Sequence, residues 1–217
     1  MYGIDDPYES FSDRASLIEA RGKSGSLAGA DLSFLDLKGI DLSGLDLSEA
    51  VFTGSDLTGA NLECCNLSSI FVQDAKMGRM RVKGAIATQA FFQQTWLHEV
   101  DFSGLELTEA NFLLCQMPGV CFDGANLPDA TFMTCNLKGA SFNNCNLEGG
   151  QLRESDLEDG SFKTCNLANV DFRKTVLMNA VFEDVEAAGA LIYGKPPWDG
   201  EISDKDYGKI LPTFDGE

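Results

Sequence analysis

Every fifth residue from Leu27 to Phe182 is apolar, which gives thirty-two apolar positions in one frame without an insertion. Almost all of these residues are Leu or Phe, and the exceptions are Val72, Met77, Val82, Ala87 and Met117. A period of five matches neither the period of about 3.6 residues of a helix nor the alternation of a flat strand. The spacing therefore predicts a solenoid, in which each repeat packs only against its neighbours.

Each five-residue unit has the same internal order around its apolar centre. A small side chain usually lies two residues before the centre and Asp or Asn one residue before it, as in Ala30-Asp31-Leu32 and Ala60-Asn61-Leu62. Ser, Thr and Gly follow the centre, as in Ser43-Gly44. One large and one small inward residue per unit predict a narrow core, and the glycines favour a turn with positive φ.

This pattern resembles that of the pentapeptide repeat family, written A-(D/N)-L-x-x, over roughly residues 25–192. The resemblance implies an all-β fold, a right-handed quadrilateral β-helix with four units in each coil. The thirty-two units then form a solenoid of about eight four-sided coils over residues 27–192. With about 4.8 Å between stacked strands, the rod is expected to be about 38 Å long.

The order of Phe and Leu supports a coil of twenty residues independently of the resemblance. Residues twenty apart then stack on one wall, and Phe is confined to two alternate walls. One wall carries Phe102, Phe122, Phe142, Phe162 and Phe182, and the opposite wall carries Phe52, Phe92, Phe112, Phe132 and Phe172. The predicted core also contains Leu57, Leu62, Leu67, Leu107, Leu127, Leu137, Leu147, Leu167 and Leu177.

Residues 1–26 and 193–217 lie outside the repeat. The first segment is expected to be an N-terminal cap with a short helix from Ser12, as its N-cap, to Arg21, with Gly22 ending it. Such a cap would cover the open edges of the first coil. The second segment is either a cap on the last coil or an acidic tail that docks elsewhere.

The chain carries a formal net charge of −18 and is 44% hydrophobic. This charge disfavours direct binding to nucleic acid or to anionic lipid. No apolar run approaches the roughly 18 residues of a membrane span, and residues 1–9 lack the pattern of a signal peptide. We therefore expect a cytoplasmic protein without a membrane segment.

The sequence shows no catalytic or metal-binding constellation. His98 is the single histidine of the sequence, and because it follows the centre Leu97 it is expected at the surface. Five of the seven cysteines lie two residues before a centre, where a buried free thiol is expected. The many carboxylates point outward from a convex rod, with no cleft to shift their pKa. We expect no enzyme activity, no cofactor and no metal.

The repeat departs from its own rule between residues 70 and 98. The outward position before the centre, elsewhere mostly polar and small, is there occupied by Phe71, Lys76, Arg81, Ile86, Phe91 and Trp96. One hypothesis is an exposed aromatic and basic patch, which is typical of a contact surface. Its candidate partner-binding residues are Phe71, Lys76, Arg79, Arg81, Phe91, Trp96 and His98. The alternative is a local irregularity, a bulge or loop that turns the aromatic side chains inward.

These observations favour a non-enzymatic protein–protein interaction module that docks through an outer wall of the rod, onto another protein or onto a second copy as a homodimer. The resemblance offers an alternative, because some pentapeptide repeat proteins mimic DNA and bind DNA gyrase or topoisomerase IV. Ten acids lie just before a centre, where they serve turns, and no insertion provides a projecting loop. Both facts weaken this alternative. The run from Asp41 to Leu47 resembles proteins of bacterial secretion systems, which suggests an accessory or effector protein as a further alternative.

Overall fold

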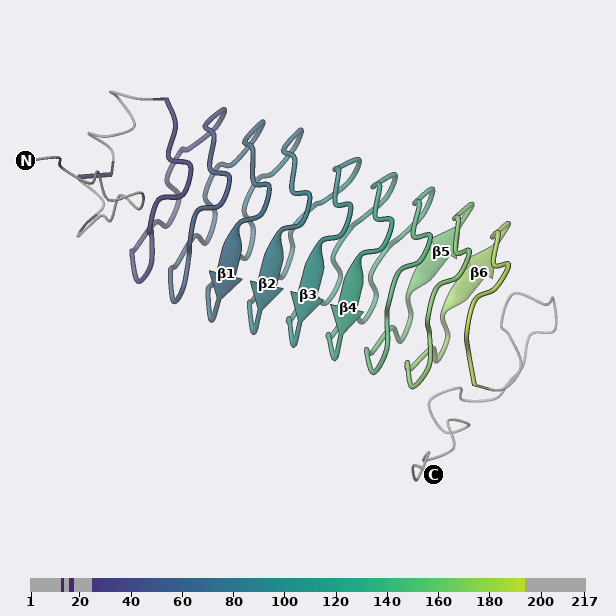
Figure 1. Ribbon diagram of the computed structural model, residues 1–217. Coiled ribbons are helices and arrows are strands. Elements are labelled where there is room, and N and C mark those ends of the chain that lie inside the picture. Colours follow the sequence, from purple (N-terminus) through teal and green to yellow (C-terminus); the bar gives the residue numbers. More distant parts are fainter. Residues whose placement is uncertain (1–12, 14–15, 18–24, 194–217) are drawn as a thin grey trace, which may run out of the picture.

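The computed structural model describes residues 13, 16–17 and 25–193, and the chain winds there into a stack of similar coils (Figure 1). Six short strands are spaced along it, and all of them pair in parallel with a shift of twenty residues, as in Phe71 with Phe91. The strands are β1 (Phe71–Gln73), β2 (Phe91–Gln93), β3 (Asn111–Leu113), β4 (Thr131–Met133), β5 (Ser161–Lys163) and β6 (Val181–Glu183). Strands β1 to β4 form one sheet, and β5 and β6 form another.

The twenty-residue register extends over the whole solenoid. Single parallel bridges connect residues twenty apart from Ser26 with Asp46 to Asp171 with Leu191. This length corresponds to about eight coils of four units, so the predicted all-β solenoid is confirmed.

The four units of a coil form four walls, which we number along the chain. The first wall contains β1 to β4, and the second contains Lys76 and Trp96. The third wall contains Arg81 together with β5 and β6, and the fourth contains Ile86.

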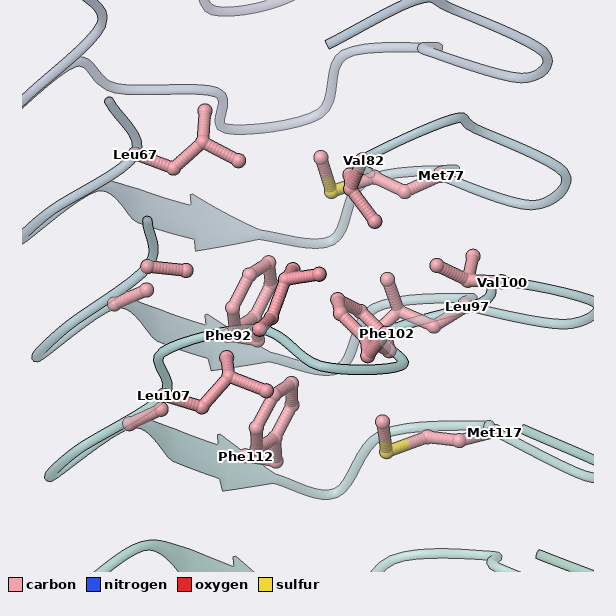
Figure 2. Packing of buried hydrophobic residues seen from close by; sticks show 14 of the residues in the cluster. Leu67, Met77, Val82, Phe92, Leu97, Val100, Phe102, Leu107, Phe112 and Met117 are labelled. Atoms are coloured by element: carbon pink, nitrogen blue, oxygen red, sulfur yellow. The ribbon is translucent and has the colours of Figure 1, made fainter. Parts of the chain in front are cut away.

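In the core, side chains from positions twenty residues apart stack along the rod, and they form columns of phenylalanine rings and columns of leucines (Figure 2). Phe92 and Phe112 of the first wall stack with centroids 4.8 Å apart and planes 2° apart. Phe102 of the third wall meets Phe112 edge to face at 6.1 Å and 73°. The first and third walls are therefore opposite, and their rings meet in the middle of the rod. Such ring pairs add about 0.5–1.5 kcal/mol each beyond the burial of their area.

The predicted core residues behave as expected. Eighteen of the nineteen belong to the buried hydrophobic cluster, and Phe182, in the last coil, is partly buried and packs against it. The neighbouring Val185, Ala187 and Ile192 are also only partly buried, so the described part of the last coil is the least covered part of the core.

The Asp and Asn residues before the centres hold the turns. The Oδ1 atom of Asp31 accepts a hydrogen bond from the backbone N–H of Ser33 at 3.0 Å, and Asp101 accepts one from Ser103 at 2.9 Å. Side chains also connect adjacent coils, since Nδ2 of Asn66 donates to Oδ1 of Asp46 at 3.0 Å. Much of the acidity of the rod is therefore part of its turn structure.

The N-terminal segment is described only in part. The Oδ1 atom of Asp13 accepts a hydrogen bond from the backbone N–H of Ser16 at 2.8 Å, the contact that an N-cap residue makes. Leu17 is fully buried and belongs to the core cluster. The predicted cap Ser12, the expected helix end at Arg21 and Gly22, and the segment 194–217 lie outside the described residues.

Each corner of the coil needs a residue with positive φ two places after the centre. Gly44 takes φ 72° there, and Leu114 takes 58° and Glu49 takes 62° at other corners. Residues with a Cβ atom are strained in this conformation by about 1–2 kcal/mol. Glycine therefore avoids this backbone strain at the corners where it occupies the positive-φ position.

We expect Gly44→Ala to lower the free energy of unfolding by about 1–2 kcal/mol. A Cβ atom at Gly44 would meet no other atom within 4 Å, so the loss would come from the backbone alone. Denaturant titration followed by circular dichroism measures this loss. Glu49→Ala is the matched control, because the residue there already has a Cβ atom at positive φ. Equal stability of Gly44→Ala and the wild type would contradict the strain at this corner.

Candidate protein-contact surface

The coils between residues 70 and 98 are regular. β1 pairs in register with β2, and Lys76 pairs with Trp96. Val72 and Phe92 point into the core, so the residues before them, Phe71 and Phe91, point outward. The hypothesis of a local irregularity that tucks these aromatic side chains inward is therefore wrong.

An aromatic pair lies on the outside of the first wall. The rings of Phe71 and Phe91 stack with centroids 5.3 Å apart and planes 5° apart. Phe71 remains 37% exposed. The twenty-residue register places the two rings in adjacent coils, so the pair is held by the backbone and offers one flat apolar surface.

The second wall presents Trp96 beside this pair. Trp96 is 55% exposed and lies above Lys76 of the preceding coil. His98 follows on the same wall, and its ring covers Gly78. A Cβ atom at Gly78 would lie 2.1 Å from Cε1 of His98, so the absence of a side chain at Gly78 lets the imidazole lie flat on the wall.

The basic residues of the predicted set do not share one surface. Nε of Arg79 lies 2.7 Å from Oε2 of Glu99, and its Nη2 lies 3.2 Å from Oε1. The hydrogen bonds and the charge of Arg79 lower the pKa of Glu99, so the charge of Arg79 is already matched. Arg81 is exposed on the third wall, opposite Phe71 and Phe91, because two five-residue steps lead to the far side of the rod.

Of the seven predicted contact residues, Arg81 thus lies on the opposite wall, and Arg79, at a corner of the second wall, is paired with Glu99. The other five lie on two neighbouring walls. We name this set the corner site, and its members are Phe71, Lys76, Phe91, Trp96 and His98. Residues 67–100, which contain it, carry four basic and two acidic residues in a chain with 34 acidic and 16 basic residues. The corner site thus lies in a segment of opposite net charge to the whole chain.

The first wall has a further property that the sequence analysis missed. Its positions directly before and after the centre carry no charged residue in five consecutive coils, and Asp74 is exposed at a corner of the same wall beside Gln73. We name this surface the neutral face, and its residues are Val51, Thr53, Phe71, Gln73, Phe91, Gln93, Asn111, Leu113, Thr131 and Met133. Reading the outward positions in steps of twenty would have found it.

Metal-holding groups were not found in the part of the chain that the structure describes. Within that part, no group of three or more His, Cys, Asp or Glu side chains could hold a metal ion. No helix of the described residues is long and apolar enough to cross a membrane.

The seven cysteines are all free thiols. Cys145 and Cys165 are buried, and their Sγ atoms donate to the carbonyl oxygens of Phe122 and Phe142 at 2.8 and 2.7 Å. Burial raises the pKa of the Cys145 thiol to about 12 and also raises the pKa of Cys165. Cys64, in contrast, is exposed at a corner.

We expect iodoacetamide to alkylate Cys64 in the native protein, while Cys145 and Cys165 stay unmodified because buried thiols form little thiolate. Peptide mass spectrometry after timed quenching measures the extent at each site. All seven cysteines should react after unfolding in guanidinium, which is the control. Native alkylation of Cys145 as fast as that of Cys64 would contradict the burial of this column.

The fold and the surface define a β-solenoid of five-residue units that exposes aromatic side chains on its walls. Family models identify the same architecture. The model described as pentapeptide repeats (8 copies) matches residues 26–63, 36–74 and 75–113, and the model described as a pentapeptide repeat region matches residues 105–182. The chain belongs to the pentapeptide repeat family.

Several solved structures of low sequence identity are similar to this chain. HetL, a pentapeptide repeat protein involved in heterocyst differentiation regulation from the cyanobacterium Nostoc sp. strain PCC 7120, is 20% identical, with 76% of this chain and 80% of HetL covered and a TM-score of 0.35. QnrB1, a plasmid-mediated fluoroquinolone resistance protein, is 16% identical over 75% of this chain and 93% of its own, with a TM-score of 0.28. Rfr23 from the cyanobacterium Cyanothece 51142 is 15% identical over 82% and 98%, with a TM-score of 0.21. No curated protein sequence matches the chain.

Proposed function

We propose that the protein is a non-enzymatic interaction module that docks another protein at the corner site. The observation that carries this proposal is the exposure of Trp96 and of Phe71, which stacks on the partly buried Phe91, on neighbouring walls. Trp and other aromatic residues dominate the energy of protein interfaces when they are buried by a partner. Apolar groups exposed together on a soluble surface mark such sites.

The backbone of the corner site is held in place before any partner binds. The N–H of Phe91 donates to the carbonyl of Ile70 in the preceding coil at 2.9 Å, and the N–H of Trp96 donates to that of Ala75 at 3.1 Å. Ordering of the interface costs affinity in most complexes, and a rigid wall avoids part of this cost. Lys76 adds a positive charge beside Trp96, which favours a partner with carboxylates around an apolar centre.

The DNA-mimic alternative, binding to DNA gyrase or topoisomerase IV, has less support. The carboxylates of Asp31, Asp46 and Asp101 accept hydrogen bonds from their own turns, so the acidity does not by itself indicate a mimic of DNA phosphates. Phe71, Phe91 and Trp96 lie within residues 67–100, which contain more basic than acidic residues. A role in a bacterial secretion system has only the Asp41 to Leu47 run in its favour.

We expect the double variant Phe91→Asp with Trp96→Asp to lose the partner that the wild type captures, because two charges would be buried in an apolar contact. The partner is first identified by pull-down and mass spectrometry. Its affinity for each purified protein is then measured by calorimetry, with an expected loss of at least about tenfold.

The matched control is Ile86→Asp with Val181→Asp. It replaces two exposed apolar side chains on the fourth and third walls and changes the charge by the same amount. Circular dichroism confirms that both variants are folded. If the partner binds the double variant at the corner site as well as it binds the control, the proposed site is wrong.

A further inference from the structure

We propose that the neutral face is the surface on which two copies of this chain associate, with their rods antiparallel. The inference goes beyond the proposed docking function, and it names a second copy as the occupant of the first wall. Phe71 and Phe91 belong to both surfaces, so this second copy competes with a partner protein at the corner site. It starts from the charge of the molecule and from the order of residues along this wall.

The neutral face is the longest uncharged strip along the solenoid. Between residues 26 and 188, none of the other three walls has more than two consecutive coils without a charged residue at the positions directly before and after the centre, whereas the first wall has five. Two copies with a net charge of −18 each repel one another. The first wall is therefore the face on which two copies meet with the least cost from like charges.

The two ends of the neutral face carry opposite charges. Asp31 lies one coil before Val51, and Arg153 lies one coil after Met133. Among the described residues, the ion pair of Arg153 is a long one to Asp171, with 3.8 Å between Nε and Oδ2. Arg173, in contrast, is paired with Asp171 at 2.6 Å between Nη2 and Oδ2.

These end charges select the antiparallel arrangement. A two-fold axis along the strands, passing through the coil of Phe91, places the coil of Asp31 of one copy against the coil of Arg153 of the other. Parallel rods would instead place Asp31 beside Asp31 and Arg153 beside Arg153, which is unfavourable. A two-fold axis also makes the contact self-complementary, as in most homodimers.

The apolar side chains of the face suit this arrangement. Phe91 lies on the axis and meets the same ring of the second copy, while Leu113 lies opposite Gln73 and Met133 lies opposite Thr53. Strands β1 to β4 pair in one register, so the face is a regular parallel sheet (Figure 1). Sheets of this kind pack face to face about 10 Å apart.

The size of the face limits the strength of the dimer. Five coils at about 4.8 Å per coil give a contact about 24 Å long and one wall wide. This is smaller than the roughly 800 Å² per partner of a standard interface. We therefore expect a reversible dimer with a dissociation constant on the order of 10 μM.

Sedimentation equilibrium of the full chain over a range of concentrations, at moderate and high salt, tests the inference. The wild type should dimerise, and Phe91→Glu should raise the dissociation constant by at least about tenfold because two carboxylates would meet on the axis. The control is Val181→Glu, which places the same charge on the third wall, on the opposite side of the rod, and should dimerise like the wild type. A wild type that stays monomeric up to about 1 mM, or equal weakening by both variants, would overturn the inference.

A charge swap tests the orientation. In the antiparallel dimer, position 53 of one copy faces position 133 of the other, so a mixture of Thr53→Glu and Met133→Lys should associate more tightly than either variant alone. Parallel rods would keep these positions apart and give no such gain, which would contradict the proposed geometry.

The two proposals can fail separately. If the wild type is monomeric but the double variant Phe91→Asp with Trp96→Asp still loses its partner protein, this inference fails and the proposed function stands. If the dimer forms while that pair keeps its partner, the corner site fails and the neutral face stands.

Discussion

The hydrogen-bonded parallel pairing of adjacent coils, with its constant register shift of twenty residues, is the constraint on which the rest of the structure depends. The N–H of Leu32 donates to the carbonyl of Val51 at 2.8 Å, and the N–H of Phe52 donates to that of Phe71 at 2.8 Å. Because this shift does not change along the solenoid, each position of a coil becomes a column. Inward columns give the stacked rings of the core, and outward columns give four distinct surfaces.

The function that we propose lies where the outward columns break the rule of the repeat. Fifteen of the thirty-two outward positions directly before a centre hold Asp or Asn, which serve the turns rather than a ligand. The hydrogen bonds from the hydroxyl group and the backbone N–H of Ser48, for example, lower the pKa of Asp46. The acidic charge of such a rod is therefore weak evidence for a partner. Phe71, Phe91 and Trp96 replace these turn residues, expose apolar surface and have no role in the core.

The core and the turns could be predicted from the sequence because they depend on a short period that recurs without an insertion. Phe112 and Leu137 are buried as the five-residue spacing predicts, and Gly44 takes the positive φ that its place in the unit indicates. The grouping of surface residues could be predicted only in part, because it depends on residues twenty apart rather than on neighbours in the chain. Arg81 and Phe91 are close in sequence but lie on opposite walls, and the pairing of Arg79 with Glu99 takes Arg79 out of the predicted patch. The neutral face becomes visible only when the outward residues of several coils are compared.

The stacking of residues twenty apart is tested most directly by comparing the stabilities of two deletion variants in denaturant-induced unfolding. Removal of residues 101–120 takes out one complete coil and leaves every later residue on its own wall. Removal of residues 101–105 shifts all later units by one wall, so that columns of Phe meet columns of Leu at the junction. We predict that the larger deletion leaves a cooperatively unfolding β-solenoid and that the smaller one is less stable, although it removes fewer residues. A five-residue deletion as stable as the twenty-residue deletion would contradict this account.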